Sequence, residues 1–292
     1  MKITVGQYAG FCFGVKRAYD LAIQSVSKAK KLKKNIYTFG PLIHNERVID
    51  SLKKQQIEII IDEKELLQIK NSIIIVRSHG IKKELYNNIK LGNNEIIDAT
   101  CPFVKKIHSL VSEKSNNNEL IVIVGNINHP EVIGIVSYSN SHIVVISNER
   151  EVELIDNLLL DNNINTINIF AQTTFETIKY EKIIEKINNK YHNIKINSYN
   201  TICASTKERQ DEVLSLAKKN DIMLIIGSKQ SSNTMNLYKT ASLVSDKVYF
   251  IEKKEDVNNI HFNINDKIGV SAGASAPCDL IREIMDYAKS RF

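Results

Sequence analysis

Three cysteines each follow a strand-like segment and open a helical one, and this repeat constrains the fold more than any other feature of the chain. The segments end in AGFC, DATC and NTIC, at Cys12, Cys101 and Cys203. Behind each cysteine, apolar residues recur at helical spacing. Each helical segment is followed by a strand that ends in a polar turn, a strand without one, and a third strand that again ends in a polar turn. This order indicates one α/β unit used three times.

The repeat predicts an α/β protein of three similar small α/β domains, in a pseudo-threefold trefoil arrangement around a central site. We place the domains at residues 1–97, 98–197 and 198–292, because the intervals between the cysteines and to the end of the chain are similar. Ligands of open parallel sheets lie beyond the carboxyl ends of the strands. Three such domains would therefore direct their loops, and with them the cysteines, to one centre.

Composition excludes several classes of protein. Over 292 residues, 43% are hydrophobic and 25% charged, as in a globular enzyme. The first residues lack the apolar stretch of a signal peptide, and no apolar run is long enough for a membrane span, so we expect a cytoplasmic protein with no membrane partner. The net charge of +6 suits an anionic substrate or acidic partner. No aromatic and basic platform accompanies that charge, so no nucleic-acid partner is expected.

The placement of the three cysteines favours metal binding. A helix N-terminus stabilises a thiolate, and a lysine lies four residues after each cysteine, at Lys16, Lys105 and Lys207. Three converging thiolates suit an iron-sulfur cluster with one iron left open to a substrate oxygen. Two alternatives stay open, namely buried structural cysteines and a zinc ion held by three cysteines and a histidine. Cys278, after Pro277, is expected to be a helix-start residue and not a fourth ligand.

Six polar turns follow the strands, and they are rich in hydrogen-bond donors. They contain His44-Asn45, Ser78-His79-Gly80, Asn128-His129-Pro130-Glu131, Gln172-Thr173-Thr174, Ser231-Ser232-Asn233, and Ser271 to Ser275. Hydroxyls, imidazoles, amides and turn N–H groups suit an oxyanion such as phosphate. Glu131 is the only carboxylate in these turns, which makes it the natural proton donor, and a threonine hydroxyl can relay the proton or orient the acid. Taken singly, each of these side chains could instead cap a turn or helix.

Seven motifs in order, AGFCFGVKRA, DATCPFVKK, NHPEVIG, AQTTF, TICASTKERQ, SSN and GASAP, resemble those of the 4-hydroxy-3-methylbut-2-enyl diphosphate reductase family. The resemblance runs from about residue 5 to residue 285 and implies one [4Fe-4S] cluster on Cys12, Cys101 and Cys203. It also implies an oxidoreductase that removes the 4-hydroxyl group of an allylic diphosphate and yields isopentenyl and dimethylallyl diphosphate. In that family the substrate oxygen binds the open iron, and two electrons come from reduced ferredoxin or flavodoxin.

The same resemblance implies roles for individual residues. Glu131, Thr173 and His129 would be catalytic, with protonation via Glu131. The substrate-binding residues would be His44, His79, His129, Thr173, Thr174, Ser231, Ser232, Asn233 and Ser275. One departure is Asn128, where the family usually has glycine; asparagine also tolerates a left-handed backbone. Two rival functions stay open: a redox sensor that binds an anion without catalysis, and a hydro-lyase that needs no reductant.

Overall fold

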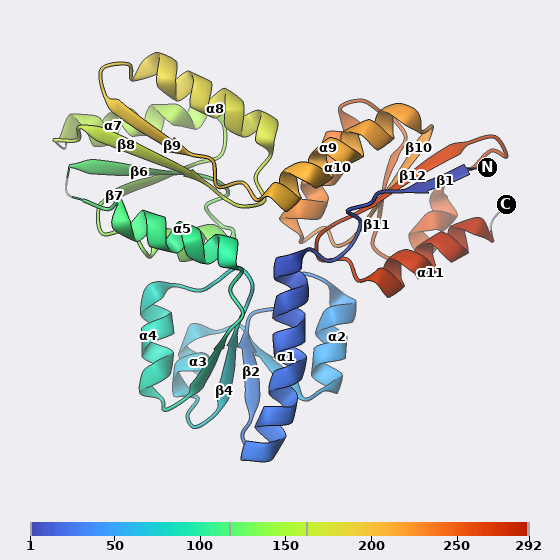
Figure 1. Cartoon of the computed structure of the whole chain (residues 1–292), viewed down its shortest axis with the longest axis horizontal. Helices are drawn as coiled ribbons and strands as arrows, with labels where there is room; N and C mark the ends of the chain where they lie inside the picture. Colours follow the sequence, from blue (N-terminus) through green and yellow to red (C-terminus); the bar gives the residue numbers. More distant parts are fainter. Residues whose placement is uncertain (1, 117, 162, 291–292) are drawn as a thin grey trace. The chain divides into compact units, whose positions relative to one another are not determined.

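Strands and helices alternate along the chain in the computed structural model, which describes residues 2–116, 118–161 and 163–290 (Figure 1). The strands are β1 (Lys2–Val5), β2 (Ile36–Phe39), β3 (Ile57–Ile60), β4 (Ile73–Val76), β5 (Glu95–Asp98), β6 (Glu119–Val124), β7 (His142–Ile146), β8 (Thr166–Ala171), β9 (Lys195–Tyr199), β10 (Ile222–Ile226), β11 (Val248–Ile251) and β12 (Lys267–Ala272). The α-helices are α1 (Phe13–Leu32), α2 (Glu46–Lys54), α3 (Glu63–Gln68), α4 (Lys83–Leu91), α5 (Pro102–Glu113), α6 (Pro130–Val136), α7 (Leu154–Asp161), α8 (Thr177–Lys190), α9 (Ala204–Lys219), α10 (Ser232–Ser242) and α11 (Cys278–Lys289). Two short 3-10 helices are η1 (Glu149–Glu153) and η2 (Lys254–Asn259).

The described strands form three four-stranded sheets, all with parallel pairing. Their orders are β3-β2-β4-β5, β7-β6-β8-β9 and β11-β10-β12-β1. In each sheet the first strand of the repeat lies between the second and the third, and the strand that leads to a cysteine occupies the edge beside the third. The predicted α/β class, with three similar parts each built on one four-stranded sheet, is confirmed.

Strand β1 belongs to the sheet formed by the last third of the chain. It pairs with β12 from Lys2 opposite Lys267 to Val5 opposite Val270, whereas the sequence-based division assigned residues 1–97 to one domain. The edge position that β5 and β9 fill in their sheets is thus filled in the third sheet by the N-terminal strand. The repeat is therefore cyclic, because the chain begins with the strand that completes its last sheet. The boundaries near residues 97 and 197 stay predictions.

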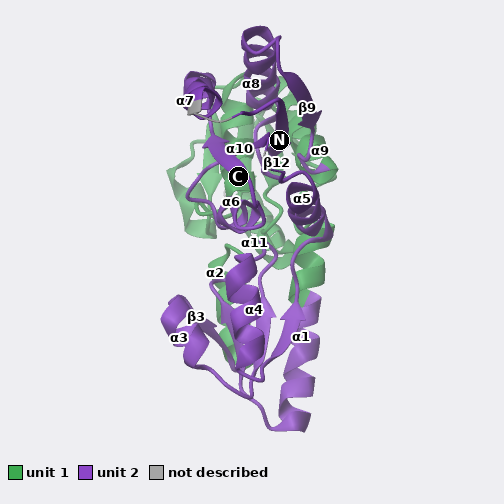
Figure 2. Cartoon of the chain, turned by 90° about the vertical axis from the view of Figure 1, so that its left-hand side faces the viewer, with its two compact units in different colours: residues 1–19, 43–55, 204–292 green, residues 20–42, 56–203 purple. Residues whose placement is uncertain are grey.

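The chain divides into two compact units, coloured separately in Figure 2. Unit 1 comprises residues 1–19, 43–55 and 204–292 and holds the sheet of β1, β10, β11 and β12. Unit 2 comprises residues 20–42 and 56–203 and holds the other two sheets. Within the described residues, no helix combines the length and the apolar character that crossing a bilayer requires.

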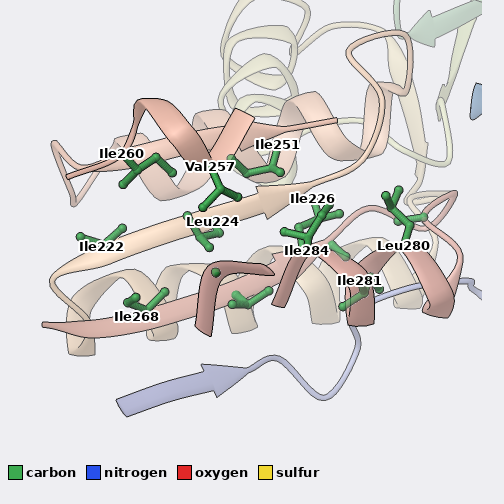
Figure 3. Packing of buried hydrophobic residues seen from close by; sticks show 14 residues of the cluster. Ile222, Leu224, Ile226, Ile251, Val257, Ile260, Ile268, Leu280, Ile281 and Ile284 are labelled. Carbon is green, nitrogen blue, oxygen red and sulfur yellow. The ribbon is translucent and has the colours of Figure 1, made fainter. Parts of the chain in front are cut away.

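The core of unit 1 explains why β10 is apolar along its whole length. Ile222, Leu224 and Ile226 face one buried cluster with α11 and η2, as Figure 3 shows, and Met223 and Ile225 face a second cluster with α9 and α10. Both faces of the strand are therefore covered, as is usual in parallel sheets. Each fully buried aliphatic side chain contributes about 1.5–3 kcal/mol.

The central strand β6 of unit 2 follows the same rule. Leu120, Val122 and Val124 pack in the cluster formed with η1, α7 and α8, whereas Ile121 and Ile123 pack against α5 and α6. With apolar side chains on both faces, only the ends of these strands are available for polar groups. The predicted polar turns lie at the carboxyl ends.

Candidate active site

A hydrogen bond from its main-chain N–H group ties each predicted cysteine to one of the polar turns. The bonds join Cys12 to the carbonyl of Ala274 (3.3 Å), Cys101 to that of Ser78 (2.9 Å) and Cys203 to that of Thr173 (2.9 Å). Each bond lies just beyond a pair of parallel strands, β1 with β12, β5 with β4 and β9 with β8. The three turns carry predicted substrate-binding side chains, so sheet pairing places each cysteine beside such a residue.

None of the three cysteines is in a disulfide bond; all are partly buried, and each lies at the start of a helix. The N–H of Val15, in the first turn of α1, donates to Cys12 Sγ at 3.5 Å. Cys101 is the N-cap residue of α5, where Pro102 follows, and Cys203 directly precedes α9. A helix N-terminus favours the charged thiolate, the form that binds metals.

The lysines that follow the cysteines do not all act as the sequence suggested. Lys105 pairs with Asp98 at 2.7 Å, and Lys207 pairs with Asp211 at 2.7 Å. Carboxylates therefore neutralise the positive charges of these two lysines. The structure gives no support for the expectation that the two charges stabilise the thiolates. Cys278 is exposed and begins α11, as expected for a helix-start residue.

Glu131 and Thr173 form a buried polar pair in unit 2. The N–H of Thr173 donates to Glu131 Oε1 at 2.6 Å, and the Thr173 hydroxyl donates to Oε2 at 2.7 Å. Glu131 is only 2% exposed. Burial raises the pKa of its carboxyl to about 7, although both hydrogen bonds lower it. A carboxyl group with this pKa exchanges a proton readily near neutral pH.

His129 is the N-cap residue of α6, where its side chain accepts a hydrogen bond. The N–H of Glu131 donates to His129 Nδ1 at 3.2 Å. An imidazole that accepts through Nδ1 carries its proton on Nε2, so Nε2 is the donor. The His79 ring lies edge-on to the His129 ring, with centroids 5.4 Å apart. Unit 2 thus brings together two predicted substrate-binding imidazoles and the acid.

A further pair of bonds orders the threonine turn. The amide of Gln172 donates to Thr174 Oγ1 at 2.9 Å, and its oxygen accepts from the N–H of Asn126 at 3.1 Å. Gln172 therefore links the turn after β8 to the loop after β6, which leads to His129. The hydroxyl of Thr174 is half-buried and oriented by this link.

Unit 1 contains a second set of the predicted residues. Asn233 on α10 accepts a hydrogen bond from the N–H of Ala274 at 2.9 Å, and the carbonyl of Ala274 accepts from Cys12. The hydroxyl of Ser275 is buried and has no hydrogen-bond partner among the described residues. A buried hydroxyl without a partner is costly unless a ligand or water satisfies it. This suits a residue that binds an anion.

The remaining predicted residues of unit 1 lie at helix starts. Ser231 caps α10 and accepts from the N–H of Thr234 at 3.3 Å, and Ser232, the first residue of that helix, is half-buried. His44 is half-buried and precedes Asn45, which caps α2. Ser231 and His129 thus do cap helices, which is the structural role that the sequence left open for them. It does not exclude binding, because a helix N-terminus also presents N–H groups to an anion.

The predicted residues are divided between the two units. Unit 1 holds Cys12, His44, Ser231, Ser232, Asn233 and Ser275, and unit 2 holds His79, Cys101, His129, Glu131, Thr173, Thr174 and Cys203. No three His, Cys, Asp or Glu side chains in the described ranges form a metal-binding group. The donor chemistry of the three helix-start cysteines, none of them in a disulfide bond, nevertheless fits an iron-sulfur cluster.

Two buried residues on the helices that follow Cys101 and Cys203 were missed in the sequence. Arg209 on α9 is 4% exposed and donates to the carbonyl of Gly10 at 2.8 Å, two residues before Cys12. His108 on α5 is also buried. The only feature of the sequence that could have identified them is a charged or polar residue on the apolar face of a helix that begins at a cysteine.

Comparisons with known proteins identify the family of the chain. A family model described as LytB protein matches residues 3–289. A protein named 4-hydroxy-3-methylbut-2-enyl diphosphate reductase from Alkaliphilus oremlandii is 38% identical over 287 residues, 98% of each chain. One of the same name from Nautilia profundicola is 41% identical over 290 residues, 99% of each chain.

Solved structures give the same result. A structure of (E)-4-hydroxy-3-methyl-but-2-enyl diphosphate reductase, described as the terminal enzyme of the non-mevalonate pathway, matches with a TM-score of 0.70 and 33% identity and covers 99% of both chains. The Plasmodium falciparum reductase matches with a TM-score of 0.82 and 27% identity, over 99% of this chain and 87% of that one. Because sequence and structure match over nearly the whole length, the chain belongs to the LytB family and is an oxidoreductase.

Proposed function

We propose that the chain reduces (E)-4-hydroxy-3-methylbut-2-enyl diphosphate to isopentenyl and dimethylallyl diphosphate. The C–O bond of the 4-hydroxyl group breaks, two electrons enter from a carrier, one proton converts the hydroxyl to water, and a second proton goes to carbon. The observation that carries the proposal is the repeated bond between a helix-start cysteine and a turn with substrate-binding chemistry. Relatives named for this reaction support the choice of substrate.

The proposed cofactor is one [4Fe-4S] cluster held by Cys12, Cys101 and Cys203. When bound, it would supply a Lewis-acidic iron and the entry point for the electrons. The electron donor is proposed to be reduced ferredoxin or flavodoxin, acidic carriers that a chain of net charge +6 attracts. A cytoplasmic location is part of the proposal, because thiols stay reduced there.

Glu131 is the proposed proton source, and Thr173 orients it. The hydroxyl and N–H of Thr173 occupy both carboxyl oxygens, so the acid has one orientation. With a pKa of about 7, the carboxyl can release a proton during turnover and regain one from solvent near neutral pH. The Thr173 hydroxyl can pass that proton, since it both donates and accepts.

The diphosphate is proposed to bind through neutral and imidazole donors. In unit 2 these are His129 Nε2, His79 and Thr174, and in unit 1 they are His44, Ser231, Ser232, Asn233 and Ser275. The unbonded hydroxyl of Ser275 supports this role, because an anion would supply the partner that it lacks. The N–H groups at the start of α10 add to the positive potential.

One experiment tests the proposal directly. The protein is purified without oxygen, its iron and visible spectrum are measured, and the diphosphate is added with reduced methyl viologen. We expect a brown protein that forms both products only when the reductant is present. Zinc in place of iron would refute the cluster. A cluster without product would indicate a sensor, and conversion without reductant would indicate a hydro-lyase.

A further inference from the structure

Unit 2 contains a buried imidazole, His108, which is not one of the proposed site residues and lies next to the turn that carries His79. His108 is on α5, seven residues after Cys101, and is 6% exposed. Its ring stacks on that of Tyr138, which follows α6, with centroids 4.1 Å apart and an interplanar angle of 11°. Nε2 is buried and has no hydrogen-bond partner among the described residues. The ring therefore acts through its shape and packing.

The turn that carries His79 rests on the edge of this ring. Gly80 adopts φ +75°, and its N–H donates to the carbonyl of Arg77 at 3.0 Å, which closes the turn. A Cβ atom at Gly80 would lie 2.8 Å from His108 Cε1 and 3.3 Å from Thr100 Cγ2. No side chain fits between the turn and the imidazole, so the position of the ring determines how deeply the turn can sit.

Helix α6, which carries Glu131, approaches the same ring from another side. A Cβ atom at Gly134 would lie 3.6 Å from His108 Nε2, 3.6 Å from the carbonyl oxygen of Ile81 and 3.8 Å from that of His79. These are ordinary van der Waals distances, so the space between this part of the helix, the ring and the turn is about the size of one methyl group. The imidazole edge thus lies next to both the turn and the helix.

The charge of the ring is consistent with this packing role. Burial lowers the pKa of His108 to about 4; the nearby Asp98 raises it and Lys105 lowers it. Asp98 is itself paired with Lys105. At neutral pH the imidazole is uncharged, so it can pack against two stretches of backbone without a counter-ion.

We propose that His108 is a positioning residue that sets the separation between the His79 turn and helix α6, and hence the separation of the two proposed diphosphate-binding imidazoles, His79 and His129. The proposal rests on the proposed function for its consequence in catalysis, but not for its geometry. Without the ring, the turn loses its support and can move toward α5. Substrate affinity then falls more than the rate of the chemical step.

Hydrogen exchange tests the geometry in the full chain, with or without activity. His108→Ala is compared with Val111→Ala, which removes a fully buried side chain from the same helix without touching the turn. We expect exchange in the 77–81 segment to become about tenfold faster only in His108→Ala. Equal changes in the two variants would reduce His108 to an ordinary core residue.

A swap of volume tests the contact itself. Gly80→Ala is made in the parent chain and in His108→Ala, and the midpoint of urea unfolding is measured. In the parent, the new Cβ lies too close to the imidazole and also adopts a strained positive φ. In the double variant, the strain and the 3.3 Å approach to Thr100 Cγ2 remain, but the clash with the imidazole is gone. Gly80→Ala should therefore lower the urea midpoint clearly more in the parent than in His108→Ala. The same loss in both backgrounds would overturn the contact.

Steady-state kinetics then tests the consequence. We expect His108→Ala to raise KM for the diphosphate substrate by about tenfold and to change kcat much less, while Val111→Ala leaves KM near the parent value. A fall in kcat at constant KM would contradict the positioning role. If the parent chain itself shows no reductant-dependent turnover, the proposed function fails, and the exchange and swap experiments still decide the role of His108.

Discussion

Thr173 holds both oxygens of the Glu131 carboxyl, with its N–H 2.6 Å from Oε1 and its hydroxyl 2.7 Å from Oε2. The two residues are 42 positions apart, on the turn after β8 and the first turn of α6. The N–H of Cys203 donates to the carbonyl of the same threonine. One residue therefore links the proposed acid to a proposed cluster ligand.

Glu131→Gln should remove the proton source and keep the fold. The amide has the same shape, and the Thr173 hydroxyl can turn to accept from it. We expect turnover to fall by about 100-fold or more, the usual contribution of a placed general acid, while iron content and diphosphate affinity stay near the parent values. Single-turnover kinetics on the anaerobically purified protein measures this. A rate within a fewfold of the parent would remove Glu131 as proton source.

The pKa of Glu131 also predicts how stability depends on pH. Its value in the folded chain, about 7, exceeds the ordinary value of 4.5. The protonated carboxyl is thus favoured by folding, and this contribution is complete below about pH 4.5 and is lost as pH rises through 7. Between these values the free energy of unfolding should fall by about 3 kcal/mol more in the parent than in Glu131→Gln. Urea unfolding of both proteins at pH 5 and pH 8 measures this difference. If the free energy of unfolding changed equally with pH in the parent and in Glu131→Gln, the raised pKa would be contradicted.

Thr173→Val and Thr173→Ser form a matched pair. Valine removes the hydroxyl that lowers the pKa of Glu131, whereas serine keeps it. We expect the pH at which turnover declines to move upward in the valine variant, because the acid then holds its proton more strongly, and the rate at the optimum to fall. The serine variant should follow the parent profile. Identical profiles for valine and parent would show that the hydroxyl has no electrostatic effect on the acid.

Asn233 can be tested by separating its observed hydrogen bond with Ala274 from its proposed contact with the diphosphate. Asn233→Asp keeps an oxygen for the N–H of Ala274 but adds a negative charge, and Asn233→Ala removes the acceptor. We expect Asn233→Asp to unfold at nearly the parent urea concentration and to lose most affinity for inorganic diphosphate. Asn233→Ala should lose about 1–2 kcal/mol of stability as well. Titration calorimetry and urea unfolding check the two effects, and normal binding by Asn233→Asp would exclude contact with the anion.

Local patterns in the sequence were enough to predict the elements around the site. The cysteine at each strand-to-helix junction, the polar turns at strand ends and the apolar strands between them all depend on neighbouring residues, which periodicity reports directly. The position of Glu131 after His129-Pro130 likewise indicated a carboxylate at a helix start. The strength of the Glu131–Thr173 pair could not be foreseen, because it depends on burial by other segments.

By itself, the sequence determined the threefold α/β plan, the candidate ligands and the family, since each is recorded in short motifs and their order. Only the tertiary structure decided that β1 completes the sheet of β10, β11 and β12, that Lys105 pairs with Asp98, and that His108 lies behind the His79 turn. The physical reason is the range of the interaction. Strand pairing between residues 265 positions apart, and the close approach of one ring to Gly80, leave no period in the sequence.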